Sequence, residues 1–345
     1  MHLSDFDYEL PDELIAQEPL PERDASRMLV VNRETQSWID ATFKSFPDYV
    51  KRNDVVVVNN TRVFPARLMG TRDPTGGRVE VLLARELGAG VWEALVRPGH
   101  RLKVGARISF GNELRAQVVD DASEQGFRQL KFEGDLPVDQ LIDRLGQTPL
   151  PPYIKRPTGT STEDRVRYQT VFAQVRGAIA APTAGLHFTE RVNEAIRERG
   201  AAIAEVTLHV GYGTFEPVRV NRISDHRVSS ESFEISSASA RTINDARAKG
   251  GRVIAVGTTT TRALESSARN DGNIEPKSGE TNLTITPGFR FRAVDAMLTN
   301  FHLPQSSLLL LVSAFAGYDL TMRAYLFAVE NRYRFYSYGD CMLVV

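Results

Sequence analysis

Three histidines, His187, His209 and His302, lie in polar turns next to apolar stretches of the chain. The ordinary pKa of imidazole lies closer to neutral pH than that of any other side chain, so these turns favour general acid–base chemistry. The three histidines are far apart in the sequence, and neither HExxH nor HxH occurs, which disfavours a zinc site. We therefore expect an active site built from these segments without a bound metal. Histidines that only pack in the core are the alternative interpretation.

The turn at residues 181–190, APTAGLHFTE, precedes a helix expected at residues 189–199. Free N–H groups at the start of a helix can hold an anion such as a carboxylate, so Thr183 and Gly185 are candidate ligand-binding residues. A helix that is merely capped by Thr189 would explain the same pattern without any ligand.

The turn at residues 207–218, TLHVGYGTFEPV, combines small and polar residues. Gly211 and Gly213 allow a ligand to approach the backbone closely, and Thr214 and Glu216 supply a hydroxyl and a carboxylate beside them. A glycine turn that only reverses the chain is the alternative. Because Glu216 stands where a GxGxxG motif needs its third glycine, a Rossmann nicotinamide site is disfavoured.

A run of threonines follows the apolar stretch VIAVG and includes Thr258, Thr259 and Thr260. It resembles a helix start that could hold a small anion, with Arg262 on the next turn of the same helix. No lysine follows, so a P-loop is disfavoured. The last polar turn, TNFHLPQSS, adds Asn300 close to the third histidine, and the GxSxG elbow of a serine hydrolase is absent.

The elements that would position these turns fall into two groups. The run DVVVVNN predicts a buried strand, and short strands then follow one another in quick succession, as in an antiparallel barrel. After a proline-rich stretch at residues 148–159, strands and helices alternate, which is typical of a parallel sheet covered by helices. We predict an α/β core with a mostly parallel sheet (residues 1–60 and 151–345) and an inserted all-β barrel-like domain (residues 61–150). Ligands of such sheets gather beyond the carboxyl ends of the strands, where the polar turns lie.

The charge distribution suggests a partner that carries phosphates. The 345 residues have a net charge of −1, but residues 62–107 and 144–191 are rich in Lys and Arg. Such stretches suit a nucleic acid, although solvated surface arginines would give the same composition. The single cysteine, Cys341, and the acidic N-terminal stretch lead us to expect a cytoplasmic protein without a targeting segment. The longest apolar run, residues 306–315, is too short to cross a membrane.

A series of motifs occurs in an order that resembles a known family. The motifs are DFDYELPDELIAQ, VVNNTRVFPARL, PPYIKR, AAPTAGLHFT, TLHVGYGTFEPV, VIAVGTTTTR, TNFHLPQSSLLLLVSAF and YRFYSYGD. The chain is similar, nearly from end to end, to the S-adenosylmethionine:tRNA ribosyltransferase-isomerases of queuosine synthesis, and residues 75–140 are its least distinctive part. The resemblance also implies an α/β core with an inserted β-barrel.

The resemblance implies a reaction in which the ribosyl moiety of S-adenosylmethionine is transferred and isomerised onto 7-aminomethyl-7-deazaguanine. This base lies at the wobble position of a tRNA with a GUN anticodon, epoxyqueuosine is formed, and adenine and methionine are released. S-adenosylmethionine is thus a consumed co-substrate, and no cofactor is expected. We further expect a monomer with no membrane partner. A non-catalytic tRNA-binding protein and an S-adenosylmethionine-dependent tRNA methyltransferase are the alternative functions.

Individual residues receive roles on this basis. As a hypothesis, proton transfers are assigned to His187 and His209, with His302 and Glu216 as alternatives. The methionine carboxylate would lie against the turn at residues 183–187 or against the threonine run.

Two further segments complete the expected site. The closing motif contributes Arg334, Tyr338 and Asp340, which would line the base pocket or contact tRNA, with structural pairing as the alternative. Where the family has an HxMHxE stretch, this chain reads HRVSSE. Ser229 therefore stands in place of the second histidine, while His226 and Glu231 remain.

Overall fold

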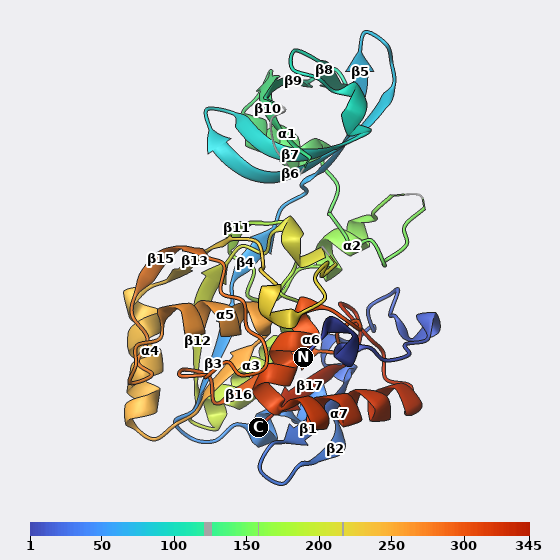
Figure 1. Cartoon of the computed structure of the whole chain (residues 1–345). Helices are drawn as coiled ribbons and strands as arrows, with labels where there is room; N and C mark the ends of the chain where they lie inside the picture. The colour runs from blue at the N-terminus through green and yellow to red at the C-terminus, as the bar shows by residue number, and fades with distance from the viewer. Residues whose placement is uncertain (121–125, 158, 216) are drawn as a thin grey trace.

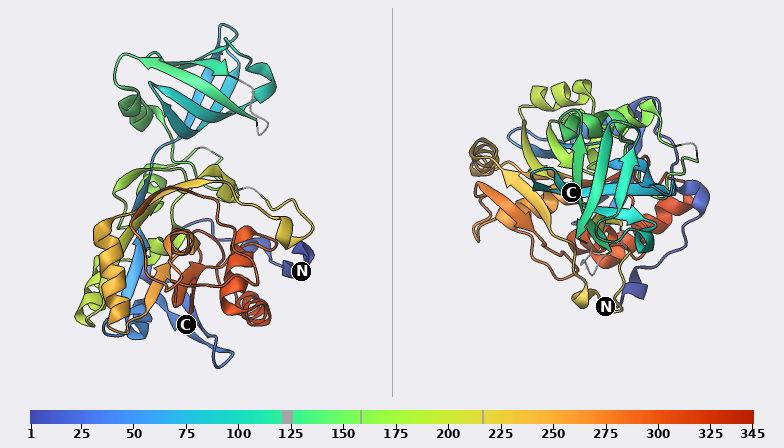
Figure 2. Two further views of the ribbon diagram at one scale, coloured as in Figure 1. Left: turned by 60° about the vertical axis from the view of Figure 1, so that its left-hand side comes forward. Right: turned by 90° about the horizontal axis from the view of Figure 1, so that it is seen from above.

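The computed structural model describes residues 1–120, 126–157, 159–215 and 217–345, which form two units (Figure 1). The larger unit is built on a nine-stranded sheet, and the smaller unit is a closed six-stranded barrel. The barrel stands to one side of the larger unit on two connecting segments, as the views in Figures 1 and 2 both show.

The large sheet is mixed. Its strands run in the order β15 (Lys277–Thr281), β13 (Glu231–Ile235), β12 (Ala202–Leu208), β3 (Val55–Asn59), β14 (Val253–Val256), β16 (Ala296–Asn300), β17 (Cys341–Val344), β1 (Arg27–Asn32) and β2 (Ser37–Thr42). Four neighbouring pairs are parallel, namely β12–β3, β3–β14, β14–β16 and β17–β1. The other four pairs are antiparallel.

The prediction of a mostly parallel sheet therefore holds only for the four central strands, β12, β3, β14 and β16. Towards one edge, the C-terminal strand β17 lies antiparallel to β16, and the N-terminal hairpin β1–β2 extends the sheet beyond it. Towards the other edge, β13 and β15 add antiparallel pairs. Alternation of strands and helices indicates parallel crossovers, but it carries no information about hairpins added at the edges.

The valine run of β3 explains why this strand lies at the centre of the sheet. Val55 and Val57 pack into one hydrophobic core, and Val56 and Val58 pack into another core on the opposite face. Successive side chains of a strand point to opposite faces, so an unbroken apolar run fits a sheet that is covered on both sides. The buried strand predicted from this run is confirmed.

Helices cover both faces of the sheet. The first core is lined by α4 (Ser237–Ala248), α5 (Thr258–Ser267), α6 (Ser307–Ala316) and α7 (Tyr318–Glu330), whereas α3 (Glu190–Glu198) packs into the second core. The helix expected after residue 189 is confirmed, because the Thr189 hydroxyl accepts a hydrogen bond from the Val192 N–H at 3.3 Å and caps α3. Most of α6 is buried, as expected for its apolar sequence.

The barrel has a hydrophobic core of its own. Around the barrel the strands are β10 (Phe127–Gly134), β7 (Val91–Arg97), β6 (Arg78–Gly88), β5 (Arg67–Asp73), β8 (Arg107–Phe110) and β9 (Leu114–Asp120). The chain enters through β4 (Thr61–Val63), which pairs with β11 (Val175–Ala178), and it returns through α1 (Val138–Leu145) and α2 (Thr162–Arg167). A domain division at residues 61 and 150 remains a prediction.

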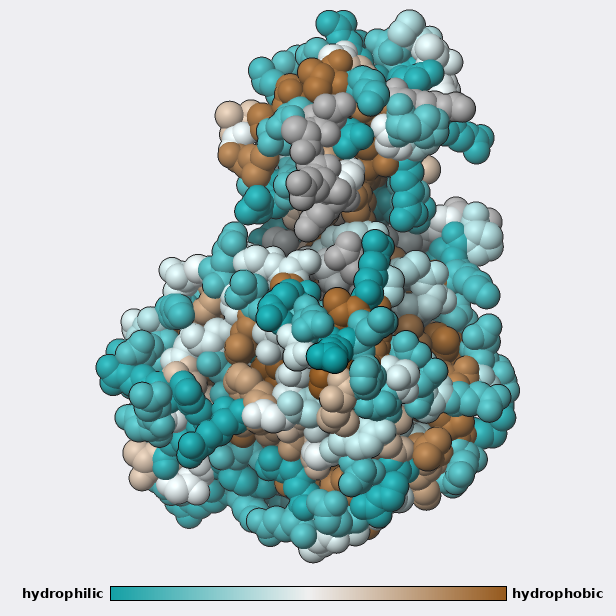
Figure 3. Space-filling model, in the orientation of Figure 1, coloured by the Kyte–Doolittle hydropathy of each residue, from teal (hydrophilic) through white to brown (hydrophobic). Residues whose placement is uncertain are grey.

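The surface in the orientation of Figure 1 is mainly hydrophilic, and the molecule narrows between the barrel and the larger unit (Figure 3). Within the described residues, no helix combines the length and the apolar character that crossing a bilayer would require.

Candidate functional site

The carboxyl ends of the central strands bring several polar turns together. Strands β12, β3, β14 and β16 are parallel, so the turns that follow them meet at the same edge of the sheet. A small pocket of about 60 Å³ lies there and is lined by five of the residues expected to bind substrate or to catalyse: Thr183, Thr258, Thr259, Asn300 and His302. The structure therefore brings together residues from three separate parts of the chain, and their roles at this pocket remain predictions.

The start of α5 determines which threonines can reach a ligand. Gly257 precedes the helix with a φ of 93°, a left-handed conformation that favours glycine, and its N–H donates to the Leu298 carbonyl at 2.8 Å. Thr258 and Thr259 line the small pocket. The Thr260 side chain instead points into the protein, where its hydroxyl donates to the Val256 carbonyl at 2.7 Å. The assignment of Thr260 to ligand binding is therefore corrected, because its hydroxyl is buried and already bonded.

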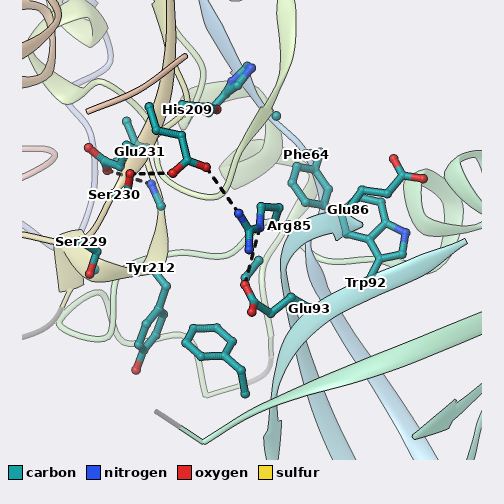
Figure 4. A pocket seen from close by; sticks show the side chains of 18 of the residues that line it. Phe64, Arg85, Glu86, Trp92, Glu93, His209, Tyr212, Ser229, Ser230 and Glu231 are labelled. Carbon is teal, nitrogen blue, oxygen red and sulfur yellow. Dashed lines mark hydrogen bonds and ion pairs between the residues drawn. The ribbon is translucent and has the colours of Figure 1, made fainter. Parts of the chain in front are cut away.

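A larger pocket of about 590 Å³ lies between the two units (Figure 4). From the larger unit it receives His209, Gly211 and Gly213, which were expected at the site. From the barrel it receives residues that the sequence did not indicate: Arg85, Glu86, Trp92, Glu93 and Phe127. Val210 lines both pockets, so the two adjoin at the turn after β12.

The ring of His209 is held from two sides. Its Nδ1 lies 2.7 Å from the Thr61 hydroxyl at the start of β4. Gly177 of β11 packs against the ring so closely that a Cβ at this position would lie 2.6 Å from Cε1 of the imidazole. Burial lowers the pKa of His209 below its ordinary value. A neutral imidazole that lines the large pocket can accept a proton there.

A buried ion pair lies beside His209. The Glu231 carboxylate pairs with the Arg262 guanidinium and also accepts a hydrogen bond from the Gly211 N–H at 3.0 Å. Arg262 was expected to bind substrate, but its guanidinium is buried against Glu231 and lines neither pocket. That assignment is corrected: Arg262 holds the carboxylate that in turn fixes the glycine turn. Ser229 lies directly against Gly213, where an added Cβ would come within 2.5 Å of its hydroxyl oxygen.

His302 is buried at the edge of the small pocket. Its Nε2 lies 2.8 Å from the Thr299 hydroxyl, and its carbonyl accepts a hydrogen bond from the Tyr8 hydroxyl. Burial lowers the pKa of His302 to about 3. The ring is therefore neutral at physiological pH and suits hydrogen bonding to a ligand better than it suits uptake of a proton.

Both ring nitrogens of His187 have partners. Nδ1 lies 3.0 Å from the Ser26 hydroxyl, and Nε2 lies 3.3 Å from the Asn300 amide nitrogen. Burial, with the nearby Arg23 and Arg334, lowers the pKa of His187 to about 4. Because the amide donates, Nε2 is the acceptor and the ring is neutral, with its proton on Nδ1. This geometry matches the alternative of a packed histidine and favours His209 over His187 for proton transfer.

His187 also helps to orient Asn300. The Asn300 amide nitrogen donates to the Tyr336 carbonyl at 3.1 Å as well as to His187, whereas its buried Oδ1 has no hydrogen-bond partner in the described part of the chain. An unpaired buried acceptor is costly unless a ligand supplies a donor. Asn300 is thus available to a ligand that enters the small pocket.

The closing motif has mainly structural contacts. The Asp340 carboxylate accepts hydrogen bonds from the backbone N–H groups of Arg27 and Arg334 at 2.8 and 2.7 Å, and burial raises its pKa. The Arg334 side chain donates to the Glu18 carbonyl. Asp340 and Arg334 line none of the three pockets near the strand ends, so their contacts match the alternative of structural pairing, and a contact with tRNA remains a prediction. Tyr338 lines a cavity of about 20 Å³ beside His187.

The remaining expected residues can be placed briefly. Gly185 lies outside both pockets and is tightly packed, since a Cβ there would meet the Thr170 methyl group at 2.9 Å. The side chain of Thr214 and the whole of Glu216 lie outside the described residues. Within the described residues, no three His, Cys, Asp or Glu side chains gather as a metal-binding group.

Comparison with known proteins identifies the family. The model of the family described as queuosine biosynthesis protein matches residues 3–344. The chain belongs to this family. It is 49% identical over 345 residues to the S-adenosylmethionine:tRNA ribosyltransferase-isomerase of Halothermothrix orenii and 50% identical over 345 residues to that of Symbiobacterium thermophilum, with 100% of each chain covered in both cases.

A solved structure agrees with these matches. The S-adenosylmethionine tRNA ribosyltransferase from Thermotoga maritima is 38% identical, and the match covers 99% of this chain and 100% of that one with a TM-score of 0.55. The resemblance found from the motifs is confirmed. Neither a non-catalytic tRNA-binding protein nor a methyltransferase is supported by these relatives.

Proposed function

We propose that this member of the queuosine biosynthesis family is an S-adenosylmethionine:tRNA ribosyltransferase-isomerase. This proposal rests on the similarity of the chain, over its full length, to relatives that bear this name. In the proposed reaction, the ribosyl moiety of S-adenosylmethionine is transferred to 7-aminomethyl-7-deazaguanine at the wobble position of a tRNA with a GUN anticodon. Epoxyqueuosine forms while adenine and methionine leave, so S-adenosylmethionine is consumed and no cofactor takes part.

The chemistry fits the side chains at the strand ends. The sulfonium of S-adenosylmethionine acidifies the neighbouring C5′ protons, so that a weak, positioned base can remove one of them. His209 suits this role because its neutral ring lines the large pocket and is held by Thr61. Loss of adenine then calls for a hydrogen-bond donor near the purine nitrogens. His302 lines the small pocket, so we place it beside the methionine end of the molecule instead.

We place the methionine end of S-adenosylmethionine in the small pocket. The first N–H groups of α5, next to Thr258 and Thr259, suit the carboxylate, and the unpaired Oδ1 of Asn300 suits the ammonium group. Thr183 lines the same pocket, so the two placements considered for the carboxylate converge on one site. At about 60 Å³ the pocket holds only one end of the molecule, and the rest would extend past Val210 towards His209.

One incubation tests the proposed function. The protein is mixed with S-adenosylmethionine and with tRNA that carries the aminomethyl-deazaguanine base, and adenine, methionine and S-adenosylhomocysteine are measured. Stoichiometric release of adenine and methionine is expected. Release of S-adenosylhomocysteine would show a methyltransferase, and salt-dependent tRNA binding without any release would show a binding protein. Sedimentation tests the proposed monomer.

A further inference from the structure

The large pocket carries an excess of negative charge, although the proposed partner is a polyanion. Its lining includes Glu86, Glu93 and Glu280, together with Glu231, whose charge is balanced by the buried Arg262, but only two arginines, Arg85 and Arg176. Arg176 is already engaged, because its guanidinium lies 3.3 and 3.0 Å from the carboxylates of Asp139 and Asp143 on α1. Such a lining repels phosphate groups and attracts a cation. Such a lining favours a ligand group that carries a positive charge.

Arg85 marks a place where two carboxylates from different units face one cation. Its Nε lies 3.8 Å from the Glu93 carboxylate on β7 (Figure 4). Its NH1 lies 3.4 Å from the Glu280 carboxylate on β15. Both separations are long for an ion pair, and the Arg85 side chain is 59% exposed. Such contacts contribute little to stability, so a ligand cation can displace this guanidinium at small cost.

The backbone of β6 turns this charged segment towards the pocket. Three consecutive residues, Ala84, Arg85 and Glu86, line the pocket, whereas a regular strand would point every second side chain away. The pairing of β6 with β7 shifts register between Leu83 and Arg85 and again between Glu86 and Gly88. Bulges of this kind re-aim side chains and are frequent beside binding sites.

Aromatic side chains form other parts of the lining. Phe127 of the barrel and Tyr212 of the larger unit meet edge to face, with ring centroids 6.4 Å apart. Trp92 also lines the pocket and is 4% exposed, and its indole N–H has no hydrogen-bond partner in the described part of the chain. Aromatic side chains contributed by both units suit contact with a flat heteroaromatic ring.

We propose that this pocket selects a flat heteroaromatic base bearing a primary ammonium group, with Glu93 and Glu280 as the residues that recognise the ammonium. Phe127 and Tyr212 contact the ring. The inference rests on the proposed function, since the base in question is the aminomethyl-deazaguanine of the acceptor tRNA. S-adenosylmethionine also carries positive charges, so the test must distinguish these two sources of a cation.

Equilibrium binding to the full-length protein provides this test. Affinities of the wild type, Glu93→Gln and Glu280→Gln are measured at fixed ionic strength for two tRNAs that differ only at the wobble base, aminomethyl-deazaguanine or guanine. The affinity for S-adenosylmethionine is measured in parallel. The control is Glu133→Gln on the barrel, because the Glu133 side chain is 76% exposed and lies outside the pocket. Fixed salt is essential, since phosphate contacts make tRNA affinity depend on ionic strength.

We expect each pocket variant to lose about fivefold in affinity for the aminomethyl tRNA, the scale of one charge-assisted contact at a partly exposed site. Binding of the guanine tRNA should stay equal or become tighter, because a charge that repels phosphates has been removed. Equal losses for both tRNAs, or no loss for either, would overturn the inference. A loss confined to S-adenosylmethionine would overturn it too, by assigning the acidic lining to that molecule. These measurements need no turnover, so they stand apart from the adenine-release test.

Discussion

Substitution of Gly177 by alanine tests whether the position of His209 matters for catalysis. The added Cβ would lie 2.6 Å from Cε1 of the imidazole and 2.7 Å from each ring nitrogen. Carbon atoms in contact keep about 3.5 Å apart, so the ring or β11 must move by about 1 Å. This shift would also disturb the 2.7 Å hydrogen bond between Nδ1 and Thr61.

The expected loss of activity follows from that displacement. Misplacing a catalytic group by about 1 Å can cost about 100-fold in rate, whereas overpacking itself costs about 1–3 kcal/mol of stability. In Gly177→Ala, single-turnover release of adenine at saturating S-adenosylmethionine and tRNA should therefore be about tenfold to 100-fold slower. Gly77→Ala is the matched control, because a Cβ at Gly77 would meet only the Thr75 hydroxyl, at 4.0 Å.

A double-mutant cycle shows whether the effect passes through the imidazole. In a His209→Ala background there is no ring to displace, so Gly177→Ala should cause no further loss of rate. Additive losses would mean that β11 itself had moved. An unchanged rate in Gly177→Ala, in a variant that retains its fold by circular dichroism, would refute proton transfer by His209.

Three further outcomes are expected. Burial lowers the pKa of His187 to about 4, whereas a histidine in the unfolded chain takes up a proton near pH 6.5. The free energy of unfolding must therefore fall as the pH falls from 6.5 to 4. His187→Gln keeps an acceptor for the Asn300 amide. Between pH 7 and pH 5, its free energy of unfolding in urea titrations should fall by about 2 kcal/mol less than that of the wild type, and an equal fall in both proteins would contradict this. Glu231→Gln leaves the buried Arg262 unpaired and should destabilise the protein by about 3–5 kcal/mol, partly recovered by adding Arg262→Met, and a loss below about 1 kcal/mol would speak against a buried pair. Thr259→Val should weaken binding of S-adenosylmethionine by about fivefold in calorimetry, whereas Thr260→Val should not, and equal effects would argue against the orientation of these side chains.

Local sequence patterns determined much of the framework. The run of four valines specified a strand buried on both faces, and the threonine at position 189 specified the start of α3. Both signals depend on neighbours within a few residues, which is why they could be interpreted without a structure. The motifs carried more: they placed the chain in its family, and they indicated the turns that line the small pocket at the strand ends.

Only the tertiary structure distinguished among the histidines. His187 and His209 look alike in sequence, yet the first is enclosed by Ser26 and Asn300, residues 161 and 113 positions away, and the second lines a pocket. The sequence also gave no indication that barrel residues would line that pocket. Its glutamates and aromatic rings lie on ordinary-looking strands, and the register shifts that turn Arg85 and its neighbours inward leave no local signal.

The physical reason is the same in each case. Hydrogen bonding, burial and pKa depend on which distant segments the fold brings within a few ångströms, and this is set by packing of the whole chain rather than by local composition. The threonine run at the start of α5 is an example within a single turn of helix. In the sequence, Thr258, Thr259 and Thr260 are three equivalent hydroxyls. The packing of α5 against the sheet places the first two at the small pocket and turns the third towards the Val256 carbonyl.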